Sequence, residues 1–409
     1  MTKRLNLLAI YKPVCLLWIA VSMFCWQYKY FNNRYNNYSI FAGVFHHTVA
    51  ETNLYRDYPA EYFDTNHYGP VFSLVVAPFA MLPTGFGFLL WNLMNAGVLI
   101  WAVTLLPLAK NRKILILLFC AIEFANTQHS IQFNPVIAAF LILTFYFVEK
   151  KREEWATFFI VIGTLIKLYP IVGLVFFMFS KRKGAFVLWS LVWAVVGVTL
   201  PMLISSPHFQ LQSYLDWYHS LSEKNVINIG LNSAQDLSVM GVVRRITSNL
   251  AVPNLPFLAV GAATLGLIVL RFKQHKSLKF RLHVLALSLM VVVLFSTGSE
   301  PPTYIIAAIG TMIYLLSQEQ PFSRGNLTFI VLIGLVAALA STDAIPAFIR
   351  KPYVSRYAMK VWPYIILWGK LVYELLFTNY AKNIASLKAA EVFEPEYLQT
   401  DEIVLESVG

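Results

Sequence analysis

Charged side chains are scarce in this chain of 409 residues. They make up 13% of it, whereas hydrophobic residues make up 58%. A soluble domain of this size needs a far more polar surface, and the long apolar runs lack the alternation that is typical of membrane β-barrels. The composition therefore predicts an all-α fold, a polytopic bundle of transmembrane helices in a lipid bilayer.

Cysteine is rare too, and acidic residues are outnumbered. The three cysteines lie inside apolar runs, so they build neither a disulfide framework nor a metal cluster, and we expect no metal and no cofactor. The net charge of +11, from 32 basic and 21 acidic residues, would suggest nucleic acid in a soluble protein. No DNA-binding or RNA-binding motif accompanies it. We therefore expect no nucleic-acid partner and assign the excess to cytoplasmic loops and to sites for anionic lipids.

The basic clusters mark the cytoplasmic side of the membrane. Apolar runs fitted between them give about 12 crossings, with both termini cytoplasmic. The first crossing, at residues 13–31, is followed by no small-residue cleavage site, so we expect it to be retained. The run at 70–82 is too short to cross and predicts a re-entrant or interfacial helix.

One membrane domain is predicted for residues 1–377. It has two large external loops, 32–69 and 205–254, and is followed by an acidic cytoplasmic tail, 378–409. Long loops on a membrane protein commonly carry its function. No internal repeat is evident, which weighs against inverted-repeat transporters.

A single lysine, Lys167, interrupts the apolar stretch 155–180, which basic runs enclose on both sides. Pro170 predicts a break that folds the stretch into two short helices, 155–166 and 170–180; the alternative is one kinked crossing. At the tip of such a hairpin, Lys167 would face an outward-open pocket and bind a phosphate. Alternatively, it extends toward the nearest lipid headgroup.

Other polar residues collect in the external loops and in a second hairpin tip, 123–135. Amides at this tip suit the wall of a polar cavity, or a hydrogen-bond network that joins helices. The loops are rich in side chains that hydrogen-bond and stack against sugars. The candidate substrate-binding residues are Tyr68, Gln132, Asn134, Tyr169 and Asn232.

Arg244 and Arg350 belong to two basic clusters that our topology places outside. Because positive charge favours the cytoplasmic side, either these clusters bind a lipid phosphate or the number of crossings is wrong by one. Of the external carboxylates, Glu300 lies in a tight turn between two short spans, where it suits a general base. The alternative for any one carboxylate is a solvated loop charge.

Four segments together resemble one family. They are NLYRDYPAEYFDTNHYGPVFSLVVAPFAMLP, SIQFNPVIAAFLILTF, GTLIKLYPIVGLVFFMFSKRK and GLNSAQDLSVMGVVRRI. Their order and spacing resemble glycosyltransferase family 87, membrane enzymes of the GT-C fold that take a sugar from a polyprenyl-phosphate carrier. Mannosyltransferases of phosphatidylinositol mannoside synthesis are familiar members.

The resemblance implies a hexosyltransferase that moves a mannose-like sugar from a polyprenyl-phosphate donor to a glycan or glycolipid acceptor. The site would be extracytoplasmic in a multi-pass protein of a cell membrane, the inner membrane in bacteria. Lys167, with Arg244 or Arg350, would stabilise the departing phosphate, and a carboxylate would deprotonate the acceptor in one inverting displacement.

Asn37 stands where the family has its catalytic aspartate, early in the first external loop. An amide cannot accept a proton at neutral pH. Three alternatives follow. The base is Asp64 or Glu300, or the alignment of this loop with the family is shifted, or this member uses a different chemistry.

Two other interpretations compete with this one. A transporter or a flippase for lipid-linked sugars, without transferase activity, would need a path to the cytoplasm, whereas this chain concentrates its polar features on one side. A ligase or polymerase that uses a pyrophosphate-linked oligosaccharide would also suit the external basic clusters.

Overall fold

The computed structural model describes residues 2–231, 233–340, 346, 348, 350–380 and 392–394, without the side chains of 2–10, 338–340, 350 and 351. All the elements named for these residues are helices, and the described part adds one isolated β-bridge, between Leu108 and Phe393. The all-α prediction is confirmed. Long apolar runs close their backbone hydrogen bonds within each helix, as a chain in lipid must do.

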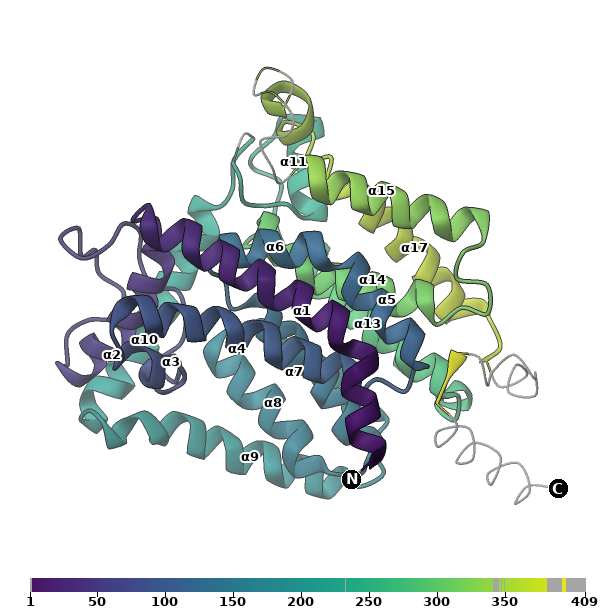
Figure 1. Cartoon of the computed structure of the whole chain (residues 1–409), viewed down its shortest axis with the longest axis horizontal. Coiled ribbons are helices and arrows are strands. Elements are labelled where there is room, and N and C mark those ends of the chain that lie inside the picture. The colour runs from purple at the N-terminus through teal and green to yellow at the C-terminus, as the bar shows by residue number, and fades with distance from the viewer. Residues whose placement is uncertain are drawn as a thin grey trace. The chain divides into compact units, whose positions relative to one another are not determined.

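Figure 1 shows the helices of the chain, which by its contacts divides into two compact units. Residues 15–99 and 127–227 form what we call the Lys167 unit. Residues 1–14, 100–126 and 228–409 form the Glu300 unit. Three helices, α1, α4 and α6, have residues in both units.

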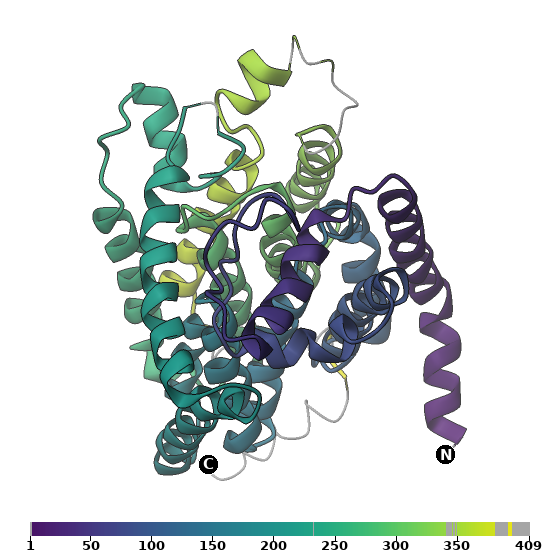
Figure 2. The ribbon, with the colours of Figure 1, turned by 90° about the vertical axis from the view of Figure 1, so that its left-hand side faces the viewer.

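The Lys167 unit holds the tip at Lys167, residues 127–135 of the second hairpin tip, and residues 32–69, the segment predicted as the first external loop. Its aromatic core includes Phe72 and Trp91, both fully buried, with Phe133 stacked on Trp91. Figure 2 shows α2 and the loop that follows it in the foreground. Its helices are α1 (Thr2–Phe31), α2 (Asn36–Val49), α3 (Phe72–Ala80), α4 (Thr84–Thr104), α6 (Ala121–His129), α7 (Asn134–Glu149), α8 (Glu153–Ile166), η1 (Tyr169–Met178), α9 (Lys183–Thr199), η2 (Leu200–Leu203) and α10 (Pro207–Ile227).

The Glu300 unit is built around an antiparallel pair, α13 and α14, in which nearly every side chain is buried. Gly310 permits their close approach, since a Cβ there would lie 2.6 Å from the Ala286 oxygen. The helices of this unit are α5 (Lys110–Phe119), α11 (Val239–Thr247), α12 (Leu255–Val269), η3 (Phe272–Gln274), α13 (Leu278–Leu294), η4 (Pro301–Thr303), α14 (Tyr304–Leu316), α15 (Arg324–Ala340), η5 (Arg350–Ser355) and α17 (Trp362–Phe377).

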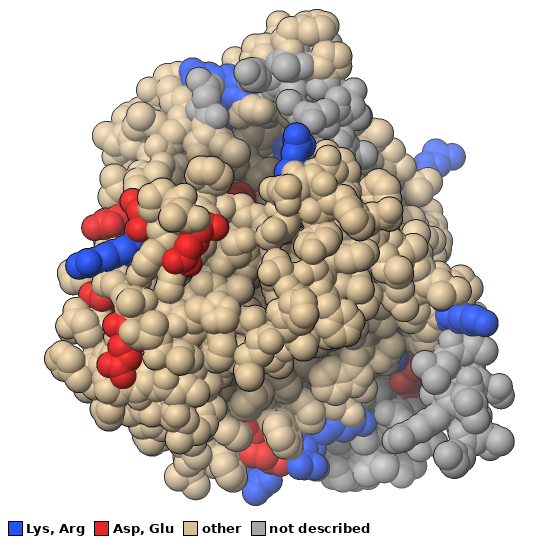
Figure 3. Space-filling model, turned by 60° about the vertical axis from the view of Figure 1, so that its left-hand side comes forward, with Lys and Arg blue, Asp and Glu red and all other residues tan. Residues whose placement is uncertain are grey.

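Three helices of the described part are long and apolar enough to cross a membrane: 11–31, 84–104 and 183–203. Several other apolar helices are shorter. Figure 3 shows a wide uncharged area on one face, with charged groups gathered toward its edges, as expected for a surface in contact with lipid. The chain thus has the features of a membrane protein, while the number of about 12 crossings stays a prediction.

Candidate functional site

The break at Lys167 is the central feature of the Lys167 unit. Helix α8 ends at Ile166, Lys167 is extended, and the 3-10 helix η1 begins at Tyr169, immediately before Pro170. The two arms fold back on each other, because Ser180 Oγ donates to Glu153 Oε1 at 2.9 Å at their far ends. The predicted hairpin is confirmed, and Lys167 lies at its tip.

The first external loop is fastened to this tip through Gly69. The amide of Gly69 donates to the Ile166 oxygen at 2.9 Å. A Cβ on Gly69 would lie 1.9 Å from the Leu165 oxygen, so only glycine allows this approach. The contact brings the neighbouring residue, Tyr68, beside Lys167.

Five of the predicted residues meet here, and we call them the Lys167 cluster: Tyr68, Gln132, Asn134, Lys167 and Tyr169. Lys167 Nζ donates to Asn134 Oδ1 at 2.9 Å, and lies 5.6 Å and 4.8 Å from the ring centroids of Tyr68 and Tyr169. The Tyr68 hydroxyl donates to Gln132 Oε1 at 3.3 Å. An amide oxygen and two ring faces thus contact the ammonium group.

Asp64 lies in the same external loop, and its side chain is 58% exposed. Its Oδ1 is 3.5 Å from Lys224 Nζ and 3.9 Å from His67 Nε2. His67 Nδ1 in turn lies 2.9 Å from Ser220 Oγ, and Trp217 Nε1 donates to the His67 oxygen at 3.0 Å. Helix α10, from the second external loop, therefore holds the Asp64 loop in place.

The charge of His67 is set by its surroundings. Burial lowers its pKa to about 4, and the cations Lys224 and Lys167 act in the same direction against Asp64. His67 is consequently neutral at neutral pH. Since the charge on Lys167 acts on this ring, Lys167 and the Asp64 loop belong to one electrostatic environment.

His67, Ser220 and Lys224 were not among the predicted site residues. The abundance of histidine, tyrosine and asparagine in the loops was a signal, but it did not pair individual residues. Asn37 was predicted and is half-buried in α2, where its Nδ2 donates to the Ser130 oxygen at 2.8 Å. That bond fastens α2 to the chain just before Gln132.

In the Glu300 unit, the turn before η4 is bonded to the segment before α11. The amide of Asp236 donates to the Thr297 oxygen at 3.0 Å, and that of Leu237 to the Ser299 oxygen at 2.9 Å. Glu300 is half-buried, and its amide donates to Thr303 Oγ1 at 3.3 Å.

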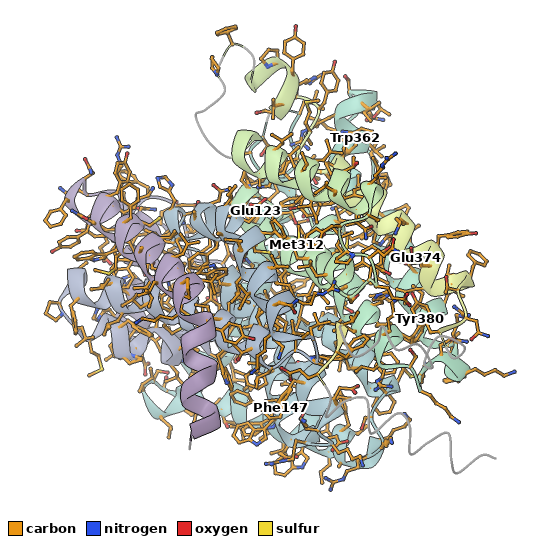
Figure 4. All side chains as sticks on the ribbon, turned by 45° about the vertical axis from the view of Figure 1, so that its right-hand side comes forward. Glu123, Phe147, Met312, Trp362, Glu374 and Tyr380 are labelled. Atoms are coloured by element: carbon orange, nitrogen blue, oxygen red, sulfur yellow. The ribbon has the colours of Figure 1, made fainter. Side chains whose placement is uncertain are left out.

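Next to Glu300, the backbone oxygen of Pro301 accepts a bond of 3.2 Å from Lys360 Nζ. Lys360 Nζ also donates to Glu123 Oε2 at 2.8 Å. Figure 4 labels Glu123 in α6. Both charged groups are buried, and such a pair is stable only with good geometry and further hydrogen bonds. The pair fixes the backbone beside Glu300.

Arg244 is also in the Glu300 unit, and it is 1% exposed. Its Nη1 donates to Asp236 Oδ2 at 2.7 Å, its Nε donates to the Val252 oxygen at 3.1 Å, and Nη2 donates to Asn254. Its predicted role in phosphate binding stays a prediction. The side chain of Arg350 and all of Asn232 lie outside the described residues.

A metal centre was not expected from the sequence. Among the residues that the structure describes, no three His, Cys, Asp or Glu side chains come together in a group that could hold a metal ion.

The comparisons with known proteins bear on this site. The model of glycosyltransferase family 87 matches residues 66–297, which is more than half of the chain. The match includes the whole Lys167 cluster, whereas Asn37, Asp64 and Glu300 lie just outside it. No curated protein matches the chain. On the strength of the family match, the chain belongs to glycosyltransferase family 87 and is a membrane glycosyltransferase.

Proposed function

We propose that this glycosyltransferase moves a mannose-like hexose from a polyprenyl-phosphate donor to a lipid-linked or glycan-linked acceptor, with inversion. The observation that carries the proposal is the position of Lys167. Its ammonium group is half-buried at the tip of a helical hairpin, between two tyrosine rings. An ion at such a place is a functional candidate by default.

The donor phosphate is proposed to lie against Lys167. When the bond between sugar and phosphate breaks, negative charge grows on the phosphate, and a fixed cation stabilises that charge more than it stabilises the ground state. Lysine serves as a point-charge partner for phosphate. Asn134 would keep the ammonium group oriented between turnovers.

The sugar is proposed to occupy the space beside Tyr68 and Tyr169. Aromatic faces and amides are the groups that stack on and hydrogen-bond to a hexose, and Gln132 and Asn134 supply the amides. Both tyrosines also flank the cation. Donor sugar and donor phosphate would thus be bound by neighbouring side chains.

Asp64 is the proposed general base. Its carboxylate is exposed to an incoming acceptor hydroxyl, and Lys224 lies beside it at 3.5 Å. A carboxylate that removes the acceptor proton while the hydroxyl attacks completes a single, inverting displacement. Glu300 is the second candidate because its backbone is held in a well-ordered turn.

The proposed setting is the extracytoplasmic side of a cell membrane, in a GT-C fold with about 12 crossings. In bacteria this would be the inner membrane. The helical composition and the membership of family 87 support this setting.

The test is transfer of labelled mannose from a polyprenyl-phosphate donor into lipid or glycan by purified protein in detergent. For Lys167→Met we expect turnover to fall about 100-fold or more, because a transition-state cation is lost. Lys181→Met is the matched control, since Lys181 is exposed beyond the other end of η1. Full turnover by Lys167→Met would refute the proposed role. Movement of the sugar lipid across vesicles without transfer would indicate a flippase instead.

A further inference from the structure

Helix α10 presents two chemically different faces. One face carries Trp217, Ser220 and Lys224, which contact His67 and Asp64 as described above. The spacing of these three residues puts them on one side of the helix. This side is therefore occupied by the first external loop.

The opposite face exposes large apolar side chains. Leu211 is 56% exposed, Leu215 58%, Tyr218 69% and Val226 70%. Their spacing puts all four on the side away from Trp217, where the exposed Ser222 lies between Tyr218 and Val226. We call these four residues the α10 stripe. The polar residues Gln212 and Glu223 border it.

The stripe continues the apolar surface of a membrane-spanning segment. Residues 183–203 form one of the three helical stretches long and apolar enough to span, and Leu191, Val195 and Leu203 in it are more than 60% exposed. Only residues 204–206 separate it from α10. In Figure 1, α9 runs along the lower edge and α10 follows at its left-hand end.

The corner between the two helices is fixed by hydrogen bonds. The amide of Ser206 donates to Glu51 Oε1 at 2.6 Å, and its hydroxyl donates to Glu51 Oε2 at 2.9 Å. Asn53 Nδ2 donates to Asp216 Oδ2 at 2.8 Å, further along α10. The direction in which α10 leaves the span is thus set by the first external loop.

We propose that α10 lies in the outer headgroup layer of the bilayer, with the α10 stripe in contact with lipid. A helix that exposes leucines and is joined directly to a span reaches this layer without a linker, and burying those leucines there is favourable. Tyr218 is of a residue type that is enriched at such interfaces. A second protein chain is the other occupant to be tested; lipid is favoured because α10 follows directly on a stretch that is long and apolar enough to span and exposes Leu191, Val195 and Leu203.

The proposal has a consequence that rests on the proposed function. The face of α10 that contacts His67 and Asp64 would hold them at the level of the membrane surface. The acceptor hydroxyl must then reach this level, so the acceptor is a lipid-linked one rather than a free sugar in solution.

The contact with lipid is tested with nitroxide labels at Leu215→Cys and, as matched control, Glu223→Cys, in phospholipid vesicles. Collisions with oxygen report lipid, and collisions with a water-soluble nickel complex report water. We expect the label at 215 to favour oxygen and the label at 223 to favour nickel. The unsubstituted chain, with its three native cysteines, gives the background.

Equal access of the nickel complex to both labels would overturn the proposal. A label at 215 shielded from both reagents would overturn it too, because it would show a protein partner. Neither outcome depends on transferase activity, so this test can fail or succeed independently of the proposed function.

The consequence is tested with the double variant Leu211→Ser/Leu215→Ser in vesicles. We expect transfer to lipid-linked acceptor to fall about tenfold, with Gln212→Ser unchanged. Unchanged transfer by the double variant would overturn the consequence. If the parent chain shows no transfer, the proposed function fails while the label result stands.

Discussion

Two groups of basic side chains in this molecule look alike in the sequence and differ in their surroundings. Lys167 is half-buried beside an amide and two aromatic rings. Arg244 is fully buried against the Asp236 carboxylate. Arg245 donates to the backbone oxygen of Asp236 at 2.7 Å. We call Asp236, Arg244 and Arg245 the Asp236–Arg244 cluster.

The different surroundings suggest different roles: Arg244 stabilises the fold, and Lys167 is the proposed binding group. A cation whose hydrogen-bond capacity goes to a carboxylate, to a backbone oxygen and to a side-chain amide is committed to the fold, as Arg244 is with Asp236, Val252 and Asn254. Lys167 donates instead to an amide oxygen at a hairpin tip, beside two aromatic rings, where the proposed function puts the donor phosphate. The comparison predicts loss of stability in one cluster and loss of activity in the other.

The largest expected effect is on stability, in the Asp236–Arg244 cluster. Asp236→Asn leaves the Arg244 guanidinium buried without a counter-ion, so the free energy of unfolding should fall by about 3–5 kcal/mol. Thermal unfolding in detergent measures this. The control is Glu154→Gln, which removes an exposed ion pair with Arg152 and should cost less than about 1 kcal/mol. If the two variants were equally stable, Asp236 and Arg244 would not have the stabilising role assigned to them here.

The next effect concerns turnover and the proposed general base, Asp64. Asp64→Asn should lower turnover about 100-fold, because an amide cannot accept the acceptor proton, while the melting temperature stays near that of the parent. Asp57→Asn, an exposed change in the same loop, is the control and should have no effect. If Glu300→Gln abolishes transfer and Asp64→Asn does not, the base is in the Glu300 unit.

A smaller effect follows from His67, which folding keeps neutral. Its folded pKa of about 4 lies below the unfolded value of about 6.5, so between these values the unfolded chain binds more protons. Stability therefore falls as the pH drops through this window, by up to about 1.4 kcal/mol for each pH unit. His67→Gln should show a flatter fall of the melting temperature than the parent, and His208→Gln, an exposed change, should not.

The smallest effect is expected for Tyr68→Phe. This change removes the hydroxyl that bonds to Gln132 and keeps the ring beside Lys167, so KM should rise less than about threefold. Tyr68→Ala removes the ring as well and should raise KM about tenfold. If the two variants behave alike, the hydroxyl and not the ring face contributes to binding.

Much of the fold could be predicted because apolar runs and proline act locally. The run at 85–108 became α4, the run at 255–272 became α12, and the break before Pro170 is present. The short run at 70–82 became α3, a helix of nine residues. Each of these depends on side chains within a few residues, so periodicity and length suffice.

Five of the candidate site residues come together in the structure, and their role in binding stays a prediction. Tyr68 is bonded to Gln132, and Lys167 to Asn134, with Tyr169 beside Lys167. The contact of His67 with Ser220 was missed because 153 residues separate the two, and no local pattern pairs them. The basic pair at 244 and 245 was predicted to be external, but no local pattern indicated that Asp236 neutralises Arg244.

The sequence by itself determined the class of the protein, its helices, and the helical break that carries Lys167, since these follow from hydrophobicity and from the geometry of proline. Only the tertiary structure decided that Arg244 meets the Asp236 carboxylate and that Lys167 lies beside Asn134 and two tyrosine rings. In the Lys167 unit, Gly69 and helix α10 bring distant segments within hydrogen-bond distance. The charge of a side chain can be read from the sequence, whereas the group that neutralises it depends on which segments the fold brings together.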